Sequence, residues 1–204
     1  MPVLTRLIPS PVVVDIRAGA LDDLAGILSD QRIAPSGRMA FAISGGSGHA
    51  LRAAFAPALP GADWFDDADG TIDGAVRLAD SIKKEGPYDA VIGLGGGKVI
   101  DCAKYAAARV GLPLVAVATN LANDGLCSPV ATLDNDAGRG SYGVPNPIGI
   151  IIDLDVIREA PPSPTGSCRT GRPVSRSTAS PPRWPGRRQR PCCVIQAVSV
   201  TTTS

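Results

Sequence analysis

Apolar residues over the first 160 positions switch repeatedly between two spacings. Runs of consecutive apolar residues predict buried strands, and apolar residues three or four positions apart predict helices. The predicted strands are 12–16, 39–43, 89–92, 113–117 and 148–153. The predicted helices are 21–28, 49–59, 72–82 and 99–110. This alternation favours right-handed crossovers, and therefore an α/β fold in which a parallel sheet carries helices on both faces.

Two regions break the alternation. Residues 130–133 and 141–144 flank a turn at 136–138 and predict a β-hairpin extension, and 157–162 read as the exit from the domain. Residues 163–204 contain one residue among Leu, Ile and Phe, with seven Ser, six Thr and six Pro. Such a segment buries too little apolar surface to offset its chain entropy. We therefore expect an α/β domain at 1–162 and a disordered C-terminal tail at 163–204.

Charge divides the chain at the same place. All 19 acidic residues lie before Ser163, whereas 163–204 carry seven Arg and no acid.

No apolar run approaches the roughly 20 residues of a membrane span, and residues 1–19 lack the order of a secretory signal. The five Cys include no C-x-x-C pair, which argues against a zinc ribbon or a disulfide framework. We expect a cytoplasmic protein with no membrane partner.

A run of three glycines, Gly95-Gly96-Gly97, stands between a predicted strand and a predicted helix. Glycines let the backbone approach a ligand closely, and the following helix start favours an anion such as a pyrophosphate. The alternative is a tight turn with no ligand. A P-loop is excluded because Val99 follows Lys98, and G-x-G-x-x-G fails because Lys98 takes the third glycine position. A second glycine-rich turn, 44–48, is interpreted as a surface turn.

Polar residues also follow the strand 113–117. Thr119, Asn120, Asn123, Asp124 and Ser128 supply hydroxyls, amides and a carboxylate that can converge on a polar ligand. The alternative is a capped polar loop. Because ligands of α/β sheets bind beyond the carboxyl ends of the strands, this loop and the glycine turn are candidates for one site.

Together the two segments resemble a known family. Residues 95–104, from Gly95 to Lys104, are similar to the GGG-x-x-x-D-x-A-K signature of the iron-dependent alcohol dehydrogenase and dehydroquinate synthase-like superfamily. Residues 119–129 resemble the T-x-x-S-H-D-G-x-x-S-P loop of sn-glycerol-1-phosphate dehydrogenases, with Asn123 where that loop has His. The resemblance covers about 12–162. It implies a Rossmann-like domain and NAD(P)-linked reduction of dihydroxyacetone phosphate, or a related polyol phosphate, to glycerol 1-phosphate.

The resemblance also implies roles for individual residues. The cofactor would be bound by Gly95, Gly96, Gly97, Lys98, Val99, Ile100, Asp101, Thr119, Asn120 and Ser128, and Asp124 would face the substrate. NAD and NADP both remain open. The acidic stretch 63–67 is where a third strand can end, and carboxylates there favour a free ribose over a phosphate.

Zinc or iron is the metal that the family uses to stabilise the ketone oxygen during hydride transfer. Its ligands in the family are an Asp in a Gly-Asp-Leu segment of a C-terminal helical domain, then two His. This chain has no Gly-Asp-Leu, and its single His is His49. We therefore expect an incomplete metal site, an absent helical domain, a bare face that favours aggregation, and no turnover.

The tail suggests a reason. If Gly171-Arg172-Pro173-Val174 is encoded GGG-CGA-CCT-G, the frame one base later reads Gly-Asp-Leu. Our hypothesis is that 163–204 are an out-of-frame reading; the alternative is an Arg-rich tail that binds nucleic acid phosphates.

Two alternatives to the dehydrogenase fragment also stay open: a non-catalytic nucleotide-binding module and a dehydroquinate synthase-like NAD-dependent cyclase. The expected partners are a dinucleotide, a small phosphorylated polyol or ketone and a second copy of the chain, without a specific nucleic acid.

Overall fold

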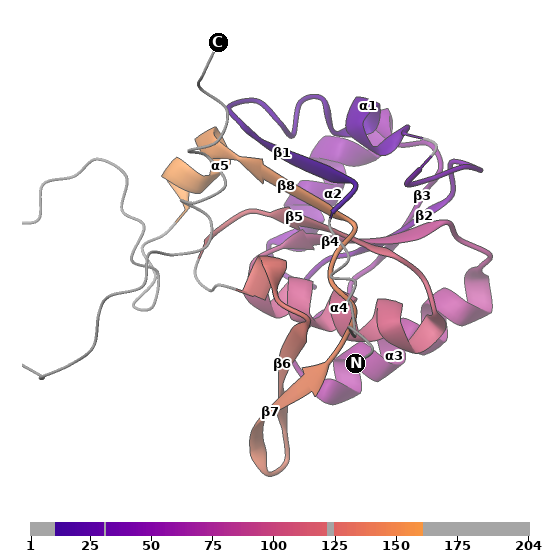
Figure 1. The fold of residues 1–204 in the computed structure, drawn as a ribbon, viewed down its shortest axis with the longest axis vertical. Coiled ribbons are helices and arrows are strands. Elements are labelled where there is room, and N and C mark those ends of the chain that lie inside the picture. The colour runs from indigo at the N-terminus through magenta and orange to yellow at the C-terminus, as the bar shows by residue number, and fades with distance from the viewer. Residues whose placement is uncertain (1–10, 31, 122–124, 161–204) are drawn as a thin grey trace, which may run out of the picture. The chain divides into compact units, whose positions relative to one another are not determined.

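The computed structural model describes residues 11–30, 32–121 and 125–160 (Figure 1). The predictions for Asn123, for Asp124 and for the tail at 163–204 lie outside these residues. The described part alternates strands and helices in the order that the sequence predicts. None of its helices is long and apolar enough to cross a membrane.

Six parallel strands form one sheet in the order β1-β8-β5-β4-β2-β3. This confirms the predicted α/β class. The chain steps from β2 outward to the edge strand β3, then returns past β2 to β4, so the winding direction changes between β2 and β4. Strand β3 comes from the acidic stretch in which the sequence indicated only the end of a strand. The bounds are β1 (Val13–Arg17), β2 (Met39–Ala42), β3 (Ala62–Phe65), β4 (Ala90–Gly95), β5 (Leu114–Ala118) and β8 (Gly149–Asp153).

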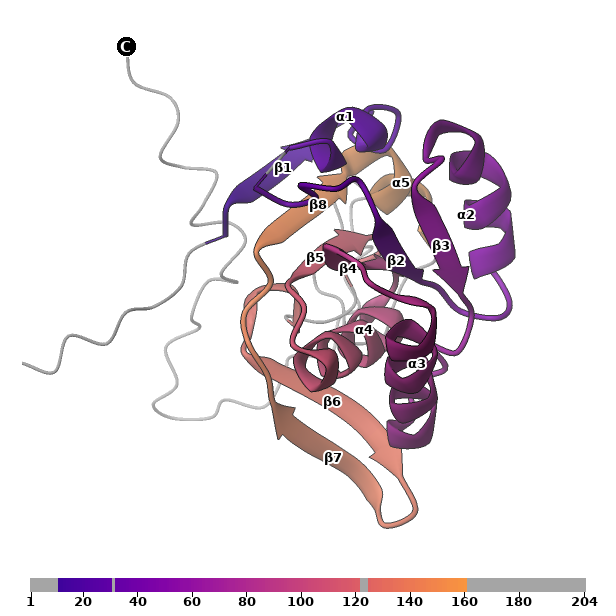
Figure 2. The ribbon, with the colours of Figure 1, turned by 90° about the vertical axis from the view of Figure 1, so that its right-hand side faces the viewer.

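Helices cover both faces of the sheet because the central strands are apolar at every position. On β4, Val91 belongs to the cluster under α3 and α4, and its neighbour Ile92 belongs to the cluster under α1 and α2. Figure 2 shows α3 and α4 lying side by side. The helix bounds are α1 (Leu24–Leu28), α2 (Gly48–Phe55), α3 (Ile72–Glu85), α4 (Gly97–Val110) and α5 (Leu154–Glu159), with a 3-10 helix η1 (Ala56–Ala58) after α2.

The predicted hairpin is confirmed as β6 (Val130–Asn135) and β7 (Gly138–Gly143), paired antiparallel. The amide of Asp134 donates to the carbonyl of Gly70 at 2.9 Å, so the hairpin is joined to the start of α3. In Figure 1 it extends away from the sheet beside α4.

Two helix predictions were wrong at their ends. The helix predicted at 49–59 changes to 3-10 geometry after Phe55, where Pro57 has no amide hydrogen to donate. The helix predicted from Leu21 begins only at Leu24; residues 21–23 form a turn, in which the amide of Leu21 donates to the carboxylate of Asp153 at 2.9 Å. Asp153 also caps α5, a short helix in the segment that the sequence analysis interpreted as an exit.

Candidate functional site

The loops that follow β4 and β5 meet at the carboxyl edge of the sheet. Their strands are hydrogen-bonded neighbours, with Gly95 opposite Ala118. The amide of Thr119 donates to the carbonyl of Gly95 at 3.0 Å. A Cβ atom added to Gly96 would lie 2.6 Å from Nδ2 of Asn120. The glycine turn and the polar loop therefore form two adjoining walls, and their predicted proximity is confirmed.

The glycines of β4 and its turn have separate packing reasons. A Cβ on Gly93 would lie 2.9 Å from Cβ of Ala103, so this glycine lets α4 pack closely on the strand. A Cβ on Gly95 would lie 2.9 Å from the Val99 side chain. Gly96 makes room for the Asn120 side chain of the second loop. The close approach of strand, helix and loop therefore depends on three positions without side chains.

Helix α4 starts in a way that suits an anion. Its N-cap is Gly96, in extended conformation, and no side chain caps it. The first turn contains no acid and one cation, Lys98. Because the first amides of a helix have no partner within it, they and the positive end of the helix dipole attract negative charge. This end lies directly beside the contact between Gly96 and Asn120.

Lys98 extends towards the hairpin. Its Nζ lies 3.6 Å from a carboxylate oxygen of Asp134, and both side chains are largely exposed. Asp134 also accepts from Arg139 at 3.2 Å, and this hydrogen bond lowers the pKa of its carboxyl. An exposed ion pair of this kind contributes little stability, so the ammonium is available to a bound anion at small cost.

Three of the predicted cofactor residues point their side chains into the protein. Val99 packs against α3, and Ile100 packs in a cluster with β5 and β8. Asp101 is buried 3.8 Å from Nζ of Lys104. Burial raises the pKa of Asp101, although the charge of Lys104 and the amide of Thr132 oppose the shift. Contact of these three with a ligand would fall to their backbone atoms.

The loop after β5 is compact where it is described. It contains a 3-10 turn at Gly125–Cys127, and the hydroxyl of Ser128 donates to the carbonyl of Gly125 at 3.3 Å. The side chain of Ser128 is thus engaged within its own loop. Asp124, the predicted substrate residue, is outside the described residues, and its role stays a prediction.

One residue near this loop was missed by the sequence analysis. Lys104 is fully buried, and its ammonium donates to the carbonyls of Gly125, Ser128 and Val130. Its place at the end of the D-x-A-K pattern was the only available signal. Nothing in a one-dimensional pattern indicates which carbonyls a buried lysine meets.

The turn at 44–48 also lies at this edge, because it follows β2, the other neighbour of β4. The hydroxyl of Ser44 accepts from the amide of Gly48 at 3.2 Å. Ser44 also forms a bridge with Asp67, which follows β3. The turn interpreted as an ordinary surface turn therefore borders the point where the winding of the sheet reverses, which is where α/β sheets bind ligands.

Carboxylates line the end of β3, and each has a basic neighbour. Asp66 lies 3.8 Å from His49, and Arg77 lies 3.5 Å from Asp67 and 3.0 Å from Asp69. The expectation that the acidic stretch ends a strand is confirmed for Asp66 and Asp67.

Asp63 does not share that position. Asp63 accepts from the hydroxyl of Tyr88 at 2.8 Å and from Arg38 at 2.9 Å. It lies at the start of β3, and therefore near the amino-terminal ends of the strands and away from the two loops. The inclusion of Asp63 among the carboxylates that face a ribose was wrong, because Asp63 lies near the start of β3, whereas Asp66 and Asp67 follow the end of that strand.

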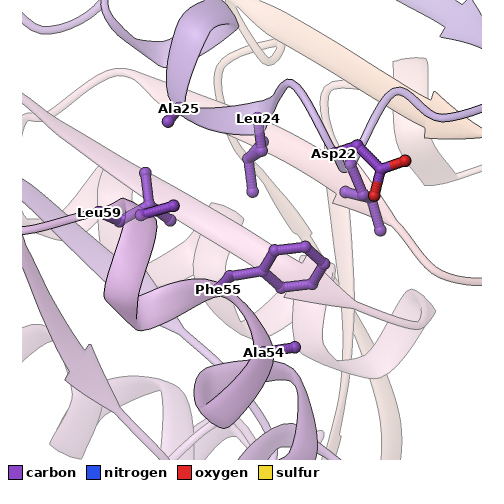
Figure 3. A pocket seen from close by; sticks show the side chains of 8 residues that line it. Asp22, Leu24, Ala25, Ala54, Phe55 and Leu59 are labelled. Atoms are coloured by element: carbon purple, nitrogen blue, oxygen red, sulfur yellow. The ribbon is translucent and has the colours of Figure 1, made fainter.

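Among the described residues no metal cluster lies at these loops, and one cavity lies elsewhere in the fold. Within residues 11–160 as far as they are described, no three His, Cys, Asp or Glu side chains gather as metal ligands. A cavity of about 190 Å³ lies between α1 and the segment formed by α2 and η1 (Figure 3). Its lining is mostly apolar and consists of Leu21, Asp22, Leu24, Ala25, Ala54, Phe55, Ala58 and Leu59. It shares no residue with the glycine turn or the polar loop.

Comparison with known proteins gives one family match. Residues 15–161 match the family described as iron-containing alcohol dehydrogenase. Over 74 residues the chain is 43% identical to a glycerol-1-phosphate dehydrogenase [NAD(P)+] of Methanococcus vannielii, which is 36% of this chain and 21% of that protein. Over 102 residues it is 37% identical to the enzyme of the same name from Methanothermobacter thermautotrophicus, which is 49% of this chain and 29% of that protein.

Solved structures agree on the fold. A probable glycerol dehydrogenase from Sinorhizobium meliloti superposes with a TM-score of 0.60 at 25% identity, over 74% of this chain and 41% of that one. A sulfoacetaldehyde reductase from Bifidobacterium kashiwanohense, solved in complex with NAD+, superposes with a TM-score of 0.64 at 18% identity, over 75% of this chain and 47% of that one. The chain thus spans less than half the length of these proteins.

Proposed function

Because the chain belongs to the iron-containing alcohol dehydrogenase family, we propose that residues 11–160 form the coenzyme-binding part of an NAD(P)-dependent dehydrogenase. The proposed reaction is the reduction of dihydroxyacetone phosphate, or of a related polyol phosphate ketone, to glycerol 1-phosphate. The observation that carries the proposal is the contact between Gly96 and Asn120. It joins the two segments whose sequences resemble the dehydrogenase loops, at the carboxyl edge of a parallel sheet.

In this proposal the pyrophosphate of the coenzyme lies at the start of α4. The amides of the first turn and the positive end of the helix dipole offset its charge. Lys98 adds a mobile positive charge, since its exposed pair with Asp134 is weak. Asn120 and Thr119 form the neighbouring wall and orient the nicotinamide half. Ser128 closes the loop that carries them.

The metal of the family does not fit the described residues. The single histidine, His49, lies exposed on α2, beside Asp66. No third ligand joins these two in the described part of the chain. We therefore derive no step through a metal. We propose instead that this part of the chain binds and orients the coenzyme, and that carbonyl activation depends on residues outside 11–160.

A second candidate is a nucleotide-binding module without catalysis. It needs only the proposed dinucleotide crevice, and the described residues bring no ligand set for a metal together. The two candidates share the binding step and differ in turnover.

A titration of the 204-residue chain with NADH and NADPH tests the shared step. Binding is followed by nicotinamide fluorescence, and NADH consumption with dihydroxyacetone phosphate is measured in the same samples with added zinc or iron. We expect saturable binding of at least one coenzyme. Folded protein that binds neither coenzyme would remove both candidates, whereas consumption of NADH would favour the dehydrogenase over the module.

A further inference from the structure

Helix α4 carries a buried cation two turns after the glycine turn. The Lys104 side chain is 0% exposed. Its Nζ donates to the carbonyl of Gly125 and, at 3.0 Å each, to the carbonyls of Ser128 and Val130. All three carbonyls belong to the segment 125–130, which connects the polar loop to the hairpin.

Asp101 adds a second link from the same helix. It lies one turn before Lys104, with its carboxylate 3.8 Å from the ammonium and its side chain 8% exposed. The amide of Thr132, on β6, donates to it. The pair therefore fixes both the loop and the first residues of the hairpin to α4.

The energetic cost of this arrangement points to a role in geometry. Removing a charged group from water costs several kcal/mol, and a well-packed apolar side chain of similar volume is often as stabilising as a buried ion pair. An apolar side chain would nevertheless remove the ammonium donor from all three carbonyls, and those of Gly125 and Val130 would keep the long hydrogen bonds from Ser128. The segment 125–130 would then shift to regain donors, because a buried carbonyl with too few partners is unfavourable.

The geometry connects Lys104 to the candidate site. The N-cap of its helix, Gly96, lies against Asn120 at the start of the polar loop, and the Lys104 ammonium holds the end of the same loop. Between them Leu126 packs with Ile100 and Ala118 under the sheet. One helix thus determines where both ends of the loop lie relative to the glycine turn.

We propose that Lys104 is a positioning residue that holds the segment 125–130 in place as the second wall of the coenzyme crevice. The part of this inference that concerns coenzyme rests on the proposed function; the part that concerns the loop does not. Lys104 itself is buried, and it acts through the backbone of the loop.

The test compares Lys104→Met with Lys84→Met in the 204-residue chain. Lys84 lies exposed in the last turn of α3 and is a matched control for loss of a lysine charge. Amide hydrogen exchange is measured without coenzyme, and NADH and NADPH are then titrated. We expect Lys104→Met to speed exchange in residues 125–130 at least tenfold, with exchange in β4 and α3 unchanged. We expect a dissociation constant about tenfold higher, with the control like the wild type.

Lys104→Gln keeps the test decisive if the Met variant does not fold, since an amide retains two hydrogens for donation. A folded Met variant with wild-type exchange in 125–130 overturns the proposal. So does exchange that becomes faster throughout the protein to the same degree, in the Met or the Gln variant. Wild-type protein that binds coenzyme no more strongly than the Met variant overturns the coenzyme part. If no form of the chain binds coenzyme while the loop responds, the proposed function fails and the loop assignment stands.

Discussion

Substitution of Gly96 by Ala isolates the contact between the two loops. The backbone at Gly96 has φ −81° and ψ −179°, which alanine adopts without strain. The new methyl group would lie 2.6 Å from Nδ2 of Asn120, where ordinary contacts are about 3.5–4.0 Å. Asn120 must therefore move by about 1 Å or rotate away.

The expected cost to folding is small and the expected cost to binding is large. Overpacking a closed core costs about 1–3 kcal/mol, but Asn120 is only half-buried and can turn towards solvent. We therefore expect the free energy of unfolding to fall by less than about 1 kcal/mol. Displacement of Asn120 removes one wall of the crevice. A tenfold weaker affinity for coenzyme, or about 1.4 kcal/mol, is the expected minimum.

The assay is a coenzyme titration paired with denaturant unfolding on each variant. Gly143→Ala is the matched control, because Gly143 lies at the end of β7 in the hairpin and a Cβ there meets no atom within 4 Å. The double variant Gly96→Ala/Asn120→Ala completes a cycle. If the clash is the cause, it binds no more weakly than Asn120→Ala alone. Coenzyme binding by Gly96→Ala that is as strong as binding by Gly143→Ala would refute the clash as the cause.

Three further outcomes are expected. Gly93→Ala brings a methyl to 2.9 Å from Cβ of Ala103 and should lower the free energy of unfolding by about 1–3 kcal/mol, measured by urea titration; an unchanged midpoint would contradict the close packing of α4 on β4. Burial opposes ionisation of Asp153, but the backbone amides that donate to it, led by that of Leu21, outweigh burial and lower its pKa. Its stabilising contribution should therefore be full above its unfolded pKa of about 3.9 and lost as pH falls towards the lower folded value. Asp153→Asn should flatten this acid limb in urea titrations at several pH values, and an unaltered limb would assign it to other carboxyls. Finally, the gene sequence across codons 158–204 should contain Gly-Asp-Leu and downstream His in a second frame; its absence ends the frame hypothesis for 163–204.

Local patterns predicted most of the fold. The apolar runs of β2, β4, β5 and β8 are continuous because both faces of these strands are buried, and the helix α3 shows its buried face at regular spacing. Ends were harder. The residues before α1 form a turn in which the amide of Leu21 donates to Asp153, a partner 132 residues away that no local pattern indicates. Strand β3 has only Phe65 buried, so its apolar signal was too weak to define it.

Some features of the candidate site were likewise predictable from local sequence, and others were not. The glycine turn and the polar loop were found from sequence because each follows its own strand directly, and strand, turn and helix are neighbours along the chain. The opposite placement of Asp63 and Asp67, the partners of Lys104 and the contact of Asn120 with Gly96 were decided by tertiary structure alone. They depend on which strands pair and in what register. Burial and hydrogen bonding between distant segments determine that pairing, and no periodicity within one segment encodes it.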